Sequence, residues 1–317
     1  MRIESLELLL SVAEYGSISQ AASHAFISQQ GASATIKGIE NDFGIVLFDR
    51  TKTGLRLTEE GARFVRRADR VVSEYRALRL SSFALECDSD TSGALEIMTT
   101  PFVTNRLEKI FVEYETLFPG SRLVITEKSS FEIIDECRDA SDERLCIVPI
   151  ADFMTGILGR VEERYRPLVR SCLMASCSWD CDISSCAYIL KEDLCHMPLA
   201  YYREEFLDRL VVHLFRGLQP DIRLRTSNLN MINQRMEQQG IVTFVDSFSA
   251  FLDRHETLDR AAVPIQDSVY FSVGILGTPD PGSPAGRFAL FFERYLGTVC
   301  AAYMKHFPLN DSALRED

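Results

Sequence analysis

The sequence contains no long apolar segment. None of its apolar runs approaches the ~20 residues that a helix needs to span a bilayer. The N-terminal stretch carries Glu4, Glu7 and Glu14 within its apolar pattern, whereas a secretory signal is basic and then uniformly apolar. These absences predict a cytoplasmic protein that has no membrane partner.

Signatures of catalysis and of metal binding are also missing. The sequence has no glycine-rich phosphate loop, no His-Glu-x-x-His pattern and no nucleophile elbow. Its five histidines are scattered without the spacing of metal ligands. We therefore expect no cofactor, no metal and no catalytic residues, and we predict that the protein is not an enzyme.

Cysteine is present nine times, an odd number that argues against a disulfide framework. Five of the cysteines lie close together in the sequence: Cys172, Cys177, Cys181, Cys186 and Cys195. Their spacing does not fit the C-x-x-C pattern of zinc sites. Buried or incidental free thiols are the default interpretation, and a redox pair or a soft-metal site is the alternative.

The net charge of −12 is unusual for a protein that binds nucleic acid, but the charge is unevenly distributed. Residues 1–82 hold 11 basic and 10 acidic side chains, whereas the remainder holds 23 basic and 36 acidic ones. The acidity therefore belongs to the second part of the chain. Such an acidic part would keep a nearly neutral N-terminal part from coating DNA non-specifically.

The first block of the sequence predicts three short helices followed by a hairpin. The first helix ends at Gly16, and the second begins near Ser19 as its N-cap. Ser28 caps a third helix that runs to Phe43, with Gly44 just beyond its end. Two short strands that follow, separated by a turn, predict a small wing.

A long helix is predicted from Thr58, its N-cap, to about Phe83. Apolar residues recur along it at the heptad spacing of a coiled coil. We expect this seam to pair with a second copy of the chain, and packing on its own body is the alternative. The predicted dimerisation residues are Phe64, Ala68, Val71, Tyr75 and Leu78.

Beyond a polar linker at 88–93, short β-like runs alternate with helical ones. This alternation predicts an α/β body with mostly parallel strands. The length of the body favours two lobes with a cleft between them.

The strongest constellation lies between Ile18 and Lys37, where the sequence reads ISQAASHAFISQQGASATIK. The small residues Ala21 and Ala22 allow two helices to approach closely. Amide side chains stand at the start of the predicted third helix. They suit base edges, because a Gln amide can both donate a hydrogen bond to adenine and accept one from it. Nearby basic side chains suit phosphates or a minor groove.

This block resembles the N-terminal domain of LysR-type transcriptional regulators. The resemblance runs without a gap from Ser5 to Gly61 and includes I-x-x-I-E-x-x-x-G-x-x-L-F-x-R followed by L-T-x-x-G. It implies an all-α winged helix-turn-helix that binds a double-stranded DNA operator, a long linker helix, and a two-lobed α/β effector domain like periplasmic binding proteins. It also implies a homodimer or a dimer of dimers.

The expected domains are 1–58 for DNA binding, 59–87 for the linker and dimerisation helix, 92–303 for the effector domain, and 304–317 for a tail. The lobes of the effector domain are expected at about 92–165 with 266–303, and at 166–265. The residues expected to contact DNA are Ser19, Gln20, Ser28, Gln29, Gln30, Ser33, Ala34, Lys37, Arg50, Lys52 and Arg56.

Two departures from the family pattern fall on the surface that would read DNA. The third helix begins Ser-Gln-Gln-Gly where the family usually has Ser-Gln-Pro-Ala, and Ala34 stands where a basic or polar residue is common. We expect an unusual operator or weaker base readout. An alternative function is therefore kept, a small-molecule binding protein whose helix-turn-helix is vestigial or contacts proteins.

The body resembles the family more loosely, and such a fold implies a small-molecule site in the cleft. Hydroxyls and amides at a helix N-terminus suit a carboxylate or another anion. The residues expected to bind the effector are Thr99, Thr100, Thr104, Ser129, Ser130, Phe131, Tyr202, Arg203 and Asp246.

Overall fold

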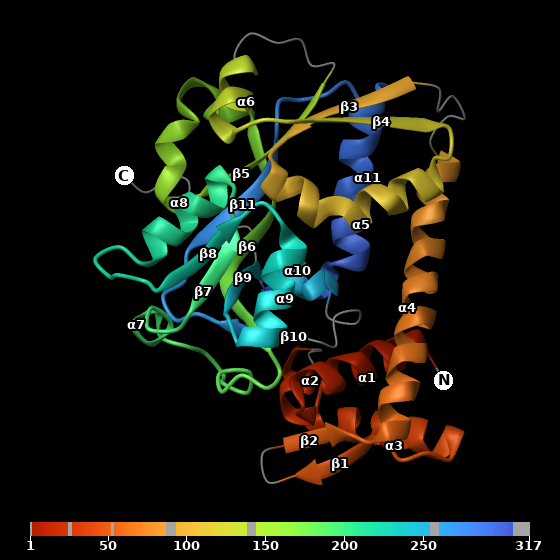
Figure 1. Ribbon diagram of the computed structural model, residues 1–317. Helices are drawn as coiled ribbons and strands as arrows, with labels where there is room; N and C mark the ends of the chain where they lie inside the picture. Colours follow the sequence, from red (N-terminus) through yellow and green to blue (C-terminus); the bar gives the residue numbers. More distant parts are fainter. Residues whose placement is uncertain are drawn as a thin grey trace. The chain divides into compact units, whose positions relative to one another are not determined.

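The chain folds into two units, Met1–Ser82 and Phe83–Asp317, which we call the head and the body (Figure 1). The computed structural model describes residues 2–24, 27–51, 54–86, 93–137, 144–253 and 260–306. Among these residues, no helix combines the length and the apolar content needed to cross a membrane.

The head begins with three helices, α1 (Ile3–Tyr15), α2 (Ile18–His24) and α3 (Gln29–Phe43). Gly16 and Gly44 end α1 and α3 in the left-handed conformation, with φ of 57° and 64°. The hydroxyl of Ser28 accepts a hydrogen bond from the backbone N–H of Gly31 at 3.1 Å, so Ser28 is confirmed as the cap of α3.

The prediction that Ser19 caps the second helix is wrong. The backbone N–H of Ala21 donates to the carbonyl of Ser17 at 3.0 Å, so the hydrogen bonding of α2 begins two residues earlier. Ser19 therefore lies inside the first turn of α2 with its side chain exposed.

The wing is an antiparallel pair of strands, β1 (Phe48–Thr51) and β2 (Gly54–Leu57). The backbone N–H of Leu55 donates to the carbonyl of Gly16 at 2.8 Å and ties the wing to the end of α1. Buried side chains from all three helices, including Leu9, Ala21 and Ile36, form one apolar cluster with Leu47. This cluster fixes the orientation of α3 within the head.

The long helix α4 (Glu59–Glu86) follows the wing directly. The Thr58 hydroxyl accepts a hydrogen bond from the Gly61 N–H at 2.8 Å and donates to the carbonyl of Val46 at 2.6 Å, so Thr58 is confirmed as the cap. A Cβ atom at Gly61 would lie 2.1 Å from the carbonyl oxygen of Leu47. Only glycine allows the start of α4 to approach the wing this closely.

The body contains a seven-stranded sheet in the order β10-β6-β11-β5-β3-β4, with β9 also paired to β6, and a separate pair β7-β8 (Figure 1). Its strands are β3 (Gly93–Thr99), β4 (Ser121–Glu127), β5 (Leu145–Ala151), β6 (Tyr165–Ser178), β7 (Leu199–Tyr202), β8 (Ile222–Thr226), β9 (Thr243–Asp246), β10 (Arg260–Pro264) and β11 (Tyr270–Leu276). Its α-helices are α5 (Pro101–Leu117), α6 (Ser130–Glu136), α7 (Lys191–Leu194), α8 (Glu205–Leu214), α9 (Leu229–Gln239), α10 (Ser247–Asp253), α11 (Pro284–Val299) and α12 (Ala301–His306).

The predicted α/β architecture is confirmed, but the expectation of mostly parallel strands is wrong. Strand β3 is parallel to β4 and β5, and β7 is parallel to β8, whereas the other four pairs of body strands described are antiparallel. Two of these four pairs come from β11, a strand from late in the sequence that inserts between β5 and β6 and runs opposite to both, and the other two join β6 to β9 and β10. An alternating sequence pattern does not reveal such an insertion.

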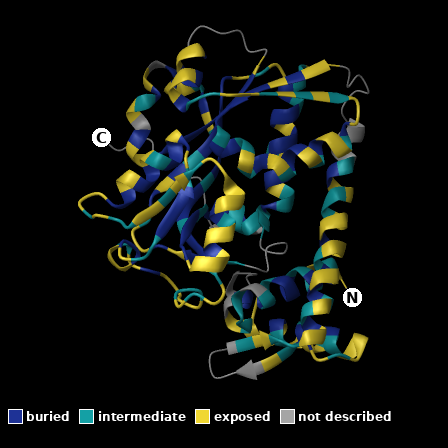
Figure 2. Ribbon diagram, viewed as in Figure 1, coloured by how far each residue is buried: buried dark blue, intermediate teal, exposed yellow. Residues whose placement is uncertain are grey.

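Side chains of β5 are buried on both faces of the sheet (Figure 2). Cys146, Val148 and Ile150 belong to an apolar cluster with Ile133 and Ile134 of α6. Because successive side chains of a strand point to opposite faces, Leu145 and Ile147 lie on the other face. Helix α6 therefore has its own small core beneath the sheet.

Strand β6 divides the body into two parts. Its first part, Tyr165–Cys172, pairs with β11, and its last part, Leu173–Ser178, pairs with β9 and β10. Asp246, the last residue of β9, therefore lies opposite Leu173 of β6, directly after the part of β6 that pairs with β11.

Candidate functional site

Helix α3 presents a polar face that begins at its capped N-terminus. Ala32, Ile36 and Ile39 are buried, whereas Gln29, Gln30, Ala34 and Lys37 are exposed and Ser33 is half-buried. This division follows the helical period, since the buried residues recur every three or four positions. The exposed amide groups are free to contact a partner outside the head.

Of the other residues predicted to contact DNA, the structure describes the side chains of some and not of others. Ser19 of α2 and Arg56 of β2 are exposed, and the Ser28 hydroxyl is occupied as a helix cap. The side chains of Gln20 and Arg50 and the whole of Lys52 lie outside the described residues.

The predicted seam of α4 divides into two parts. Ala68 is buried in the apolar cluster of the head, and the ring of Phe64 lies edge-on to Phe43 with centroids 4.8 Å apart. Farther along the helix, the seam is open to solvent: Val71, Tyr75 and Leu78 are 52%, 40% and 67% exposed. The three exposed residues are the part of the seam that remains available to a second chain.

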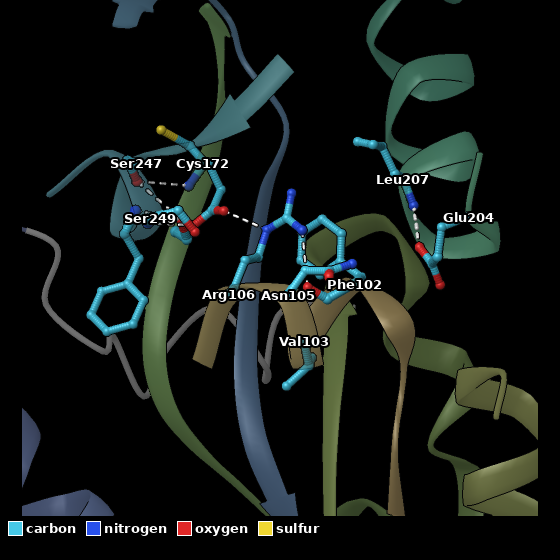
Figure 3. A network of polar contacts seen from close by, with 12 residues as sticks. Phe102, Val103, Asn105, Arg106, Cys172, Glu204, Leu207, Ser247 and Ser249 are labelled. Carbon is cyan, nitrogen blue, oxygen red and sulfur yellow. Dashed lines mark hydrogen bonds and ion pairs between the residues drawn. The ribbon is translucent and has the colours of Figure 1, made fainter. Parts of the chain in front are cut away.

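In the body, an ion pair joins α5 to the end of β9 (Figure 3). Nε of Arg106 donates to Oδ2 of Asp246 at 2.5 Å, and Nη1 of Arg106 donates to the carbonyl of Phe102 at 2.9 Å. The guanidinium carbon lies 3.4 Å from the centroid of the Phe102 ring. Arg106 is thereby held flat against its own helix, with little freedom to move away from Asp246.

Asp246 is 1% exposed and accepts further hydrogen bonds. The Ser171 hydroxyl donates to it at 3.1 Å, and the backbone N–H of Ser249 donates at 3.0 Å. A buried carboxylate costs free energy unless it is paired and hydrogen-bonded, and here both conditions are met. Strand β6, helix α10 and helix α5 thus meet at one side chain.

Two neighbouring hydroxyls extend this network toward the C-terminal helix. The Ser247 hydroxyl lies 3.1 Å from that of Ser171 and 2.8 Å from that of Tyr303, and it accepts from the Cys172 N–H at 3.1 Å. Tyr303 also donates to the carbonyl of Arg170 at 2.7 Å, and burial raises the pKa of its hydroxyl. Helix α12 is therefore anchored to the same group of residues.

A second carboxylate lies within electrostatic range of Arg106. Glu204 caps α8, where its carboxylate accepts from the Leu207 N–H at 3.0 Å (Figure 3). Burial raises the pKa of Glu204, its backbone hydrogen bonds to Leu207 and Phe206 lower it, and the charge of Arg106 lowers it further. The positive charge of Arg106 thus forms an ion pair with Asp246 and also acts on Glu204, and both carboxylates come from the later half of the chain.

Most hydroxyls predicted to bind an effector have partners inside the fold. The Thr99 hydroxyl donates to the Ile147 carbonyl at 2.7 Å, and that of Thr104 donates to the Thr100 carbonyl at 3.2 Å. The hydroxyls of Thr100 and Ser129 cap α5 and α6. Ser130 differs from these, because its Oγ is buried and makes no hydrogen bond to any described residue.

The remaining predicted effector residues are more exposed. Phe131 is 42% exposed and lies under the guanidinium of Arg209 of α8, 4.4 Å from the ring centroid. Tyr202 is half-buried, and Arg203 is exposed with its backbone N–H bonded to the Thr226 carbonyl. Asp246, by contrast, is buried and forms an ion pair with Arg106.

The sequence analysis missed Arg106, which holds the network together. A signal was present, because Arg106 follows Phe102 by one helical turn and so interrupts the apolar face of α5. A charged residue on such a face requires a buried partner. Its partner lies 140 positions away in the sequence and could not be named without the fold.

The cysteines of the predicted cluster differ in exposure. Cys172, Cys177 and Cys195 are buried, Cys181 is half-buried and Cys186 is exposed. Burial, together with the neighbouring thiol of Cys181, raises the pKa of Cys177 to about 12. Within the described residues, no group of three or more His, Cys, Asp or Glu side chains is arranged to hold a metal ion.

Known proteins resemble the chain most clearly in the head. Residues 3–62 match a family model described as bacterial regulatory helix-turn-helix protein, lysR family. The chain is 30% identical over 129 residues to the HTH-type transcriptional regulator CrgA of Neisseria meningitidis serogroup C, covering 40% of this chain and 42% of CrgA. It is 27% identical over 225 residues to a probable nitrogen assimilation transcriptional activator of Synechococcus elongatus, covering 69% of each.

The match to CrgA therefore spans less than half the length of that relative. Among solved structures, that of HinK, a LysR family transcriptional regulator from Pseudomonas aeruginosa, superposes with a TM-score of 0.49 at 19% identity. The superposition covers 94% of this chain and 99% of HinK.

We predict that Arg106 and Asp246 are energetically coupled. Arg106→Met or Asp246→Asn alone should lower the free energy of unfolding by about 3–5 kcal/mol, because each leaves a buried charge without its partner. The double variant should lose clearly less than the sum of the two, since it leaves no unpaired charge. Urea denaturation of the four proteins measures this coupling.

The matched control is the ion pair of Arg223 and Asp221, whose Nε–Oδ1 distance is 2.6 Å but whose side chains are 64% and 37% exposed. The corresponding cycle on this pair should be nearly additive, because solvent screens the charges. Additive losses at Arg106 and Asp246 would show that the two side chains do not depend on one another.

Proposed function

We propose that the chain, whose residues 3–62 match a helix-turn-helix model of the lysR family, is a transcription regulator of that family that binds a DNA operator in the cytoplasm. The observation that carries this proposal is the exposed polar face of α3, which starts with two glutamines at a helix N-terminus. A helix of this width enters a major groove, where the Gln amide can donate to N7 and accept from the N6 amino group of adenine.

Within this proposal, the residues of the head have separate roles. Gln29 and Gln30 contact base edges, while Lys37 and Arg56 contact phosphates and fix the register of the head on the duplex. The acidic body, whose residues beyond 82 hold 36 acidic against 23 basic side chains, discourages non-specific association with DNA. Specific binding then depends on the head.

We further propose that the chain acts as a homodimer or as a dimer of dimers. Support comes from Val71, Tyr75 and Leu78, whose spacing along α4 is that of a coiled-coil seam and whose side chains are exposed in the single chain. A two-fold dimer presents two copies of α3 to two half-sites, so the operator is expected to be pseudo-palindromic.

The proposed effector is a small carboxylate that binds in the body between lobes of residues 92–165 with 266–303 and residues 166–265. Support comes from the buried Ser130 hydroxyl that has no partner among the described residues. The contact of Phe131 of α6 with Arg209 of α8 would couple such a ligand to the second lobe. Its binding would alter the spacing or bend between half-sites.

A second candidate function is a small-molecule binding protein whose head no longer reads DNA. The observation that favours it is the pair Gln30 and Gly31 at the start of α3, together with Ala34 on its exposed face. These residues offer fewer charged contacts than the family pattern. Binding to DNA decides between the two functions.

We predict that substitutions in the head separate base readout from phosphate contact. Gln29→Ala should lower the preference for the operator over a scrambled duplex by about 5-fold to 100-fold, because a bidentate contact to a base is lost. Arg56→Ala should weaken both duplexes alike and reduce the salt slope by about one. Fluorescence anisotropy at several salt concentrations, with a duplex from upstream of the protein's own gene, measures both effects.

Arg223→Ala is the control, because Arg223 is exposed on the body and carries the same charge change as Arg56→Ala. It should leave both affinities unchanged. If neither head variant alters binding, or if the wild-type protein binds the two duplexes equally at matched salt, the second candidate function is favoured.

We predict that a small carboxylate raises the melting temperature of the protein and that this shift requires Ser130. A ligand that binds only the folded state stabilises it by mass action. Ser130→Ala should abolish the shift, whereas Ser176→Ala, which also removes a buried hydroxyl without a described partner, should preserve it. Thermal denaturation with a panel of small carboxylates tests this, and equal shifts in both variants would place the ligand elsewhere.

A further inference from the structure

Two cysteines outside the predicted cluster face one another in the core of the body. Cys137 is the C-cap of α6, and Cys146 lies near the start of β5. Their sulfur atoms are 2.8 Å apart, and each residue is 4% exposed. Because a disulfide bond is about 2.05 Å long, the two sulfurs need to approach by only ~0.8 Å to form one.

The surrounding structure holds both thiols in place. Cys137 and Cys146 belong to the same apolar cluster as Ile133 and Ile134, so α6 cannot rotate without losing these contacts. Nη1 of Arg164 donates to the backbone carbonyl of Cys137 at 2.8 Å and fixes the end of the helix. The short distance between the sulfurs is therefore a consequence of packing around them.

The hydrogen bond between the two thiols distinguishes the two members of the pair, and the charge of Arg164 acts on Cys137 alone. The hydrogen bond with Cys146 lowers the pKa of Cys137, burial opposes this shift, and the positive charges of Arg164 and Arg144 lower the pKa further. The same hydrogen bond and burial raise the pKa of Cys146. The thiolate, which is the reactive form, is thus favoured at Cys137.

We propose that Cys137 and Cys146 are an oxidisable pair that forms a disulfide when the protein meets a hydroperoxide. The Cys137 thiolate attacks one peroxide oxygen, the O–O bond breaks, and Cys137 becomes a sulfenic acid while the leaving oxygen departs as hydroxide. The Cys146 sulfur then attacks the Cys137 sulfur and displaces a second hydroxide. With the two thiol protons, these hydroxides form two water molecules, so two thiols and one peroxide give one disulfide and two waters.

The burial of the pair selects the oxidant. With only 4% of each residue exposed, the pair favours hydrogen peroxide, which is close to water in size, over a bulky disulfide such as oxidised glutathione. The cysteines of the segment from Cys177 to Cys186 have different surroundings, because burial and neighbouring thiols raise the pKa of Cys177. The thiolate is therefore disfavoured at Cys177.

The disulfide would join the end of α6 to β5. Helix α6 begins at Ser130 and is seven residues long, so a covalent link at its last turn restrains the whole helix. Oxidation would make this part of the body more rigid, whether or not the head binds DNA. The inference stands apart from the proposed function and is tested without DNA.

The experiment uses the full-length reduced protein and hydrogen peroxide. After treatment, the protein is alkylated in denaturant and its peptides are mapped by mass spectrometry without reduction. We expect a peptide in which Cys137 is linked to Cys146, which disappears after dithiothreitol. If Cys137 and Cys146 are both alkylated while other cysteines have been oxidised, or if Cys137 is linked to a different cysteine, the proposal is overturned.

Variants separate the two steps. In Cys146→Ser, the sulfenic acid at Cys137 should persist and be trapped by dimedone, whereas Cys137→Ser should leave Cys146 reduced. Cys186→Ser is the control, because Cys186 is an exposed cysteine outside the pair, and it should form the linked peptide as the wild type does. Absence of the dimedone adduct from folded Cys146→Ser protein would contradict the assignment of Cys137 as the attacking thiol. If that variant does not fold, the peptide map of the wild-type protein decides the proposal.

Discussion

The ion pair between Arg106 and Asp246 joins elements of the body that are far apart in the sequence. Because Asp246 is 1% exposed, its charge is tolerable only if the fold brings a cation and hydrogen-bond donors to it. Arg106 arrives from α5, Ser171 from β6, and the Ser249 N–H from α10. Three elements distant in sequence must therefore be in place together, and Tyr303 adds the C-terminal helix through Ser247. Any ligand that binds beside Arg106 would act on all of these elements.

The head depends on a different constraint, the close approach of its long helix to its wing. Thr58 bonds both the first turn of α4 and the carbonyl of Val46, and Gly61 leaves room for the carbonyl of Leu47. This junction completes the apolar cluster on which α3 lies. The position of the exposed glutamines of α3 therefore depends on side chains that pack on the opposite, buried face of the helix. A rigid support is what a base-reading helix requires, since its contacts depend on a fixed register.

Local chemistry explains what could be predicted from the sequence. The caps at Ser28 and Thr58 follow from side-chain hydrogen bonds within four residues, and the sequence signals there were sufficient. Features that depend on distant partners were not accessible. The insertion of β11 between β5 and β6 and the pairing of Arg106 with Asp246 join segments whose proximity only the fold determines. Cys137 and Cys146 are nine positions apart, but their contact depends on how α6 packs on β5. The error at Ser19 is of another kind, because Ser17 was an equally good cap two residues earlier.

The central claim is that α3 of this chain reads DNA sequence as part of a two-fold assembly. Repeated selection of random duplexes by the purified full-length protein, followed by sequencing, tests it most directly. The account predicts enrichment of one motif with two related half-sites whose centres are one helical turn, about 10 base pairs, or a multiple of it apart. Recovery of duplexes without a common motif, at a salt concentration where non-specific binding is weak, would contradict it.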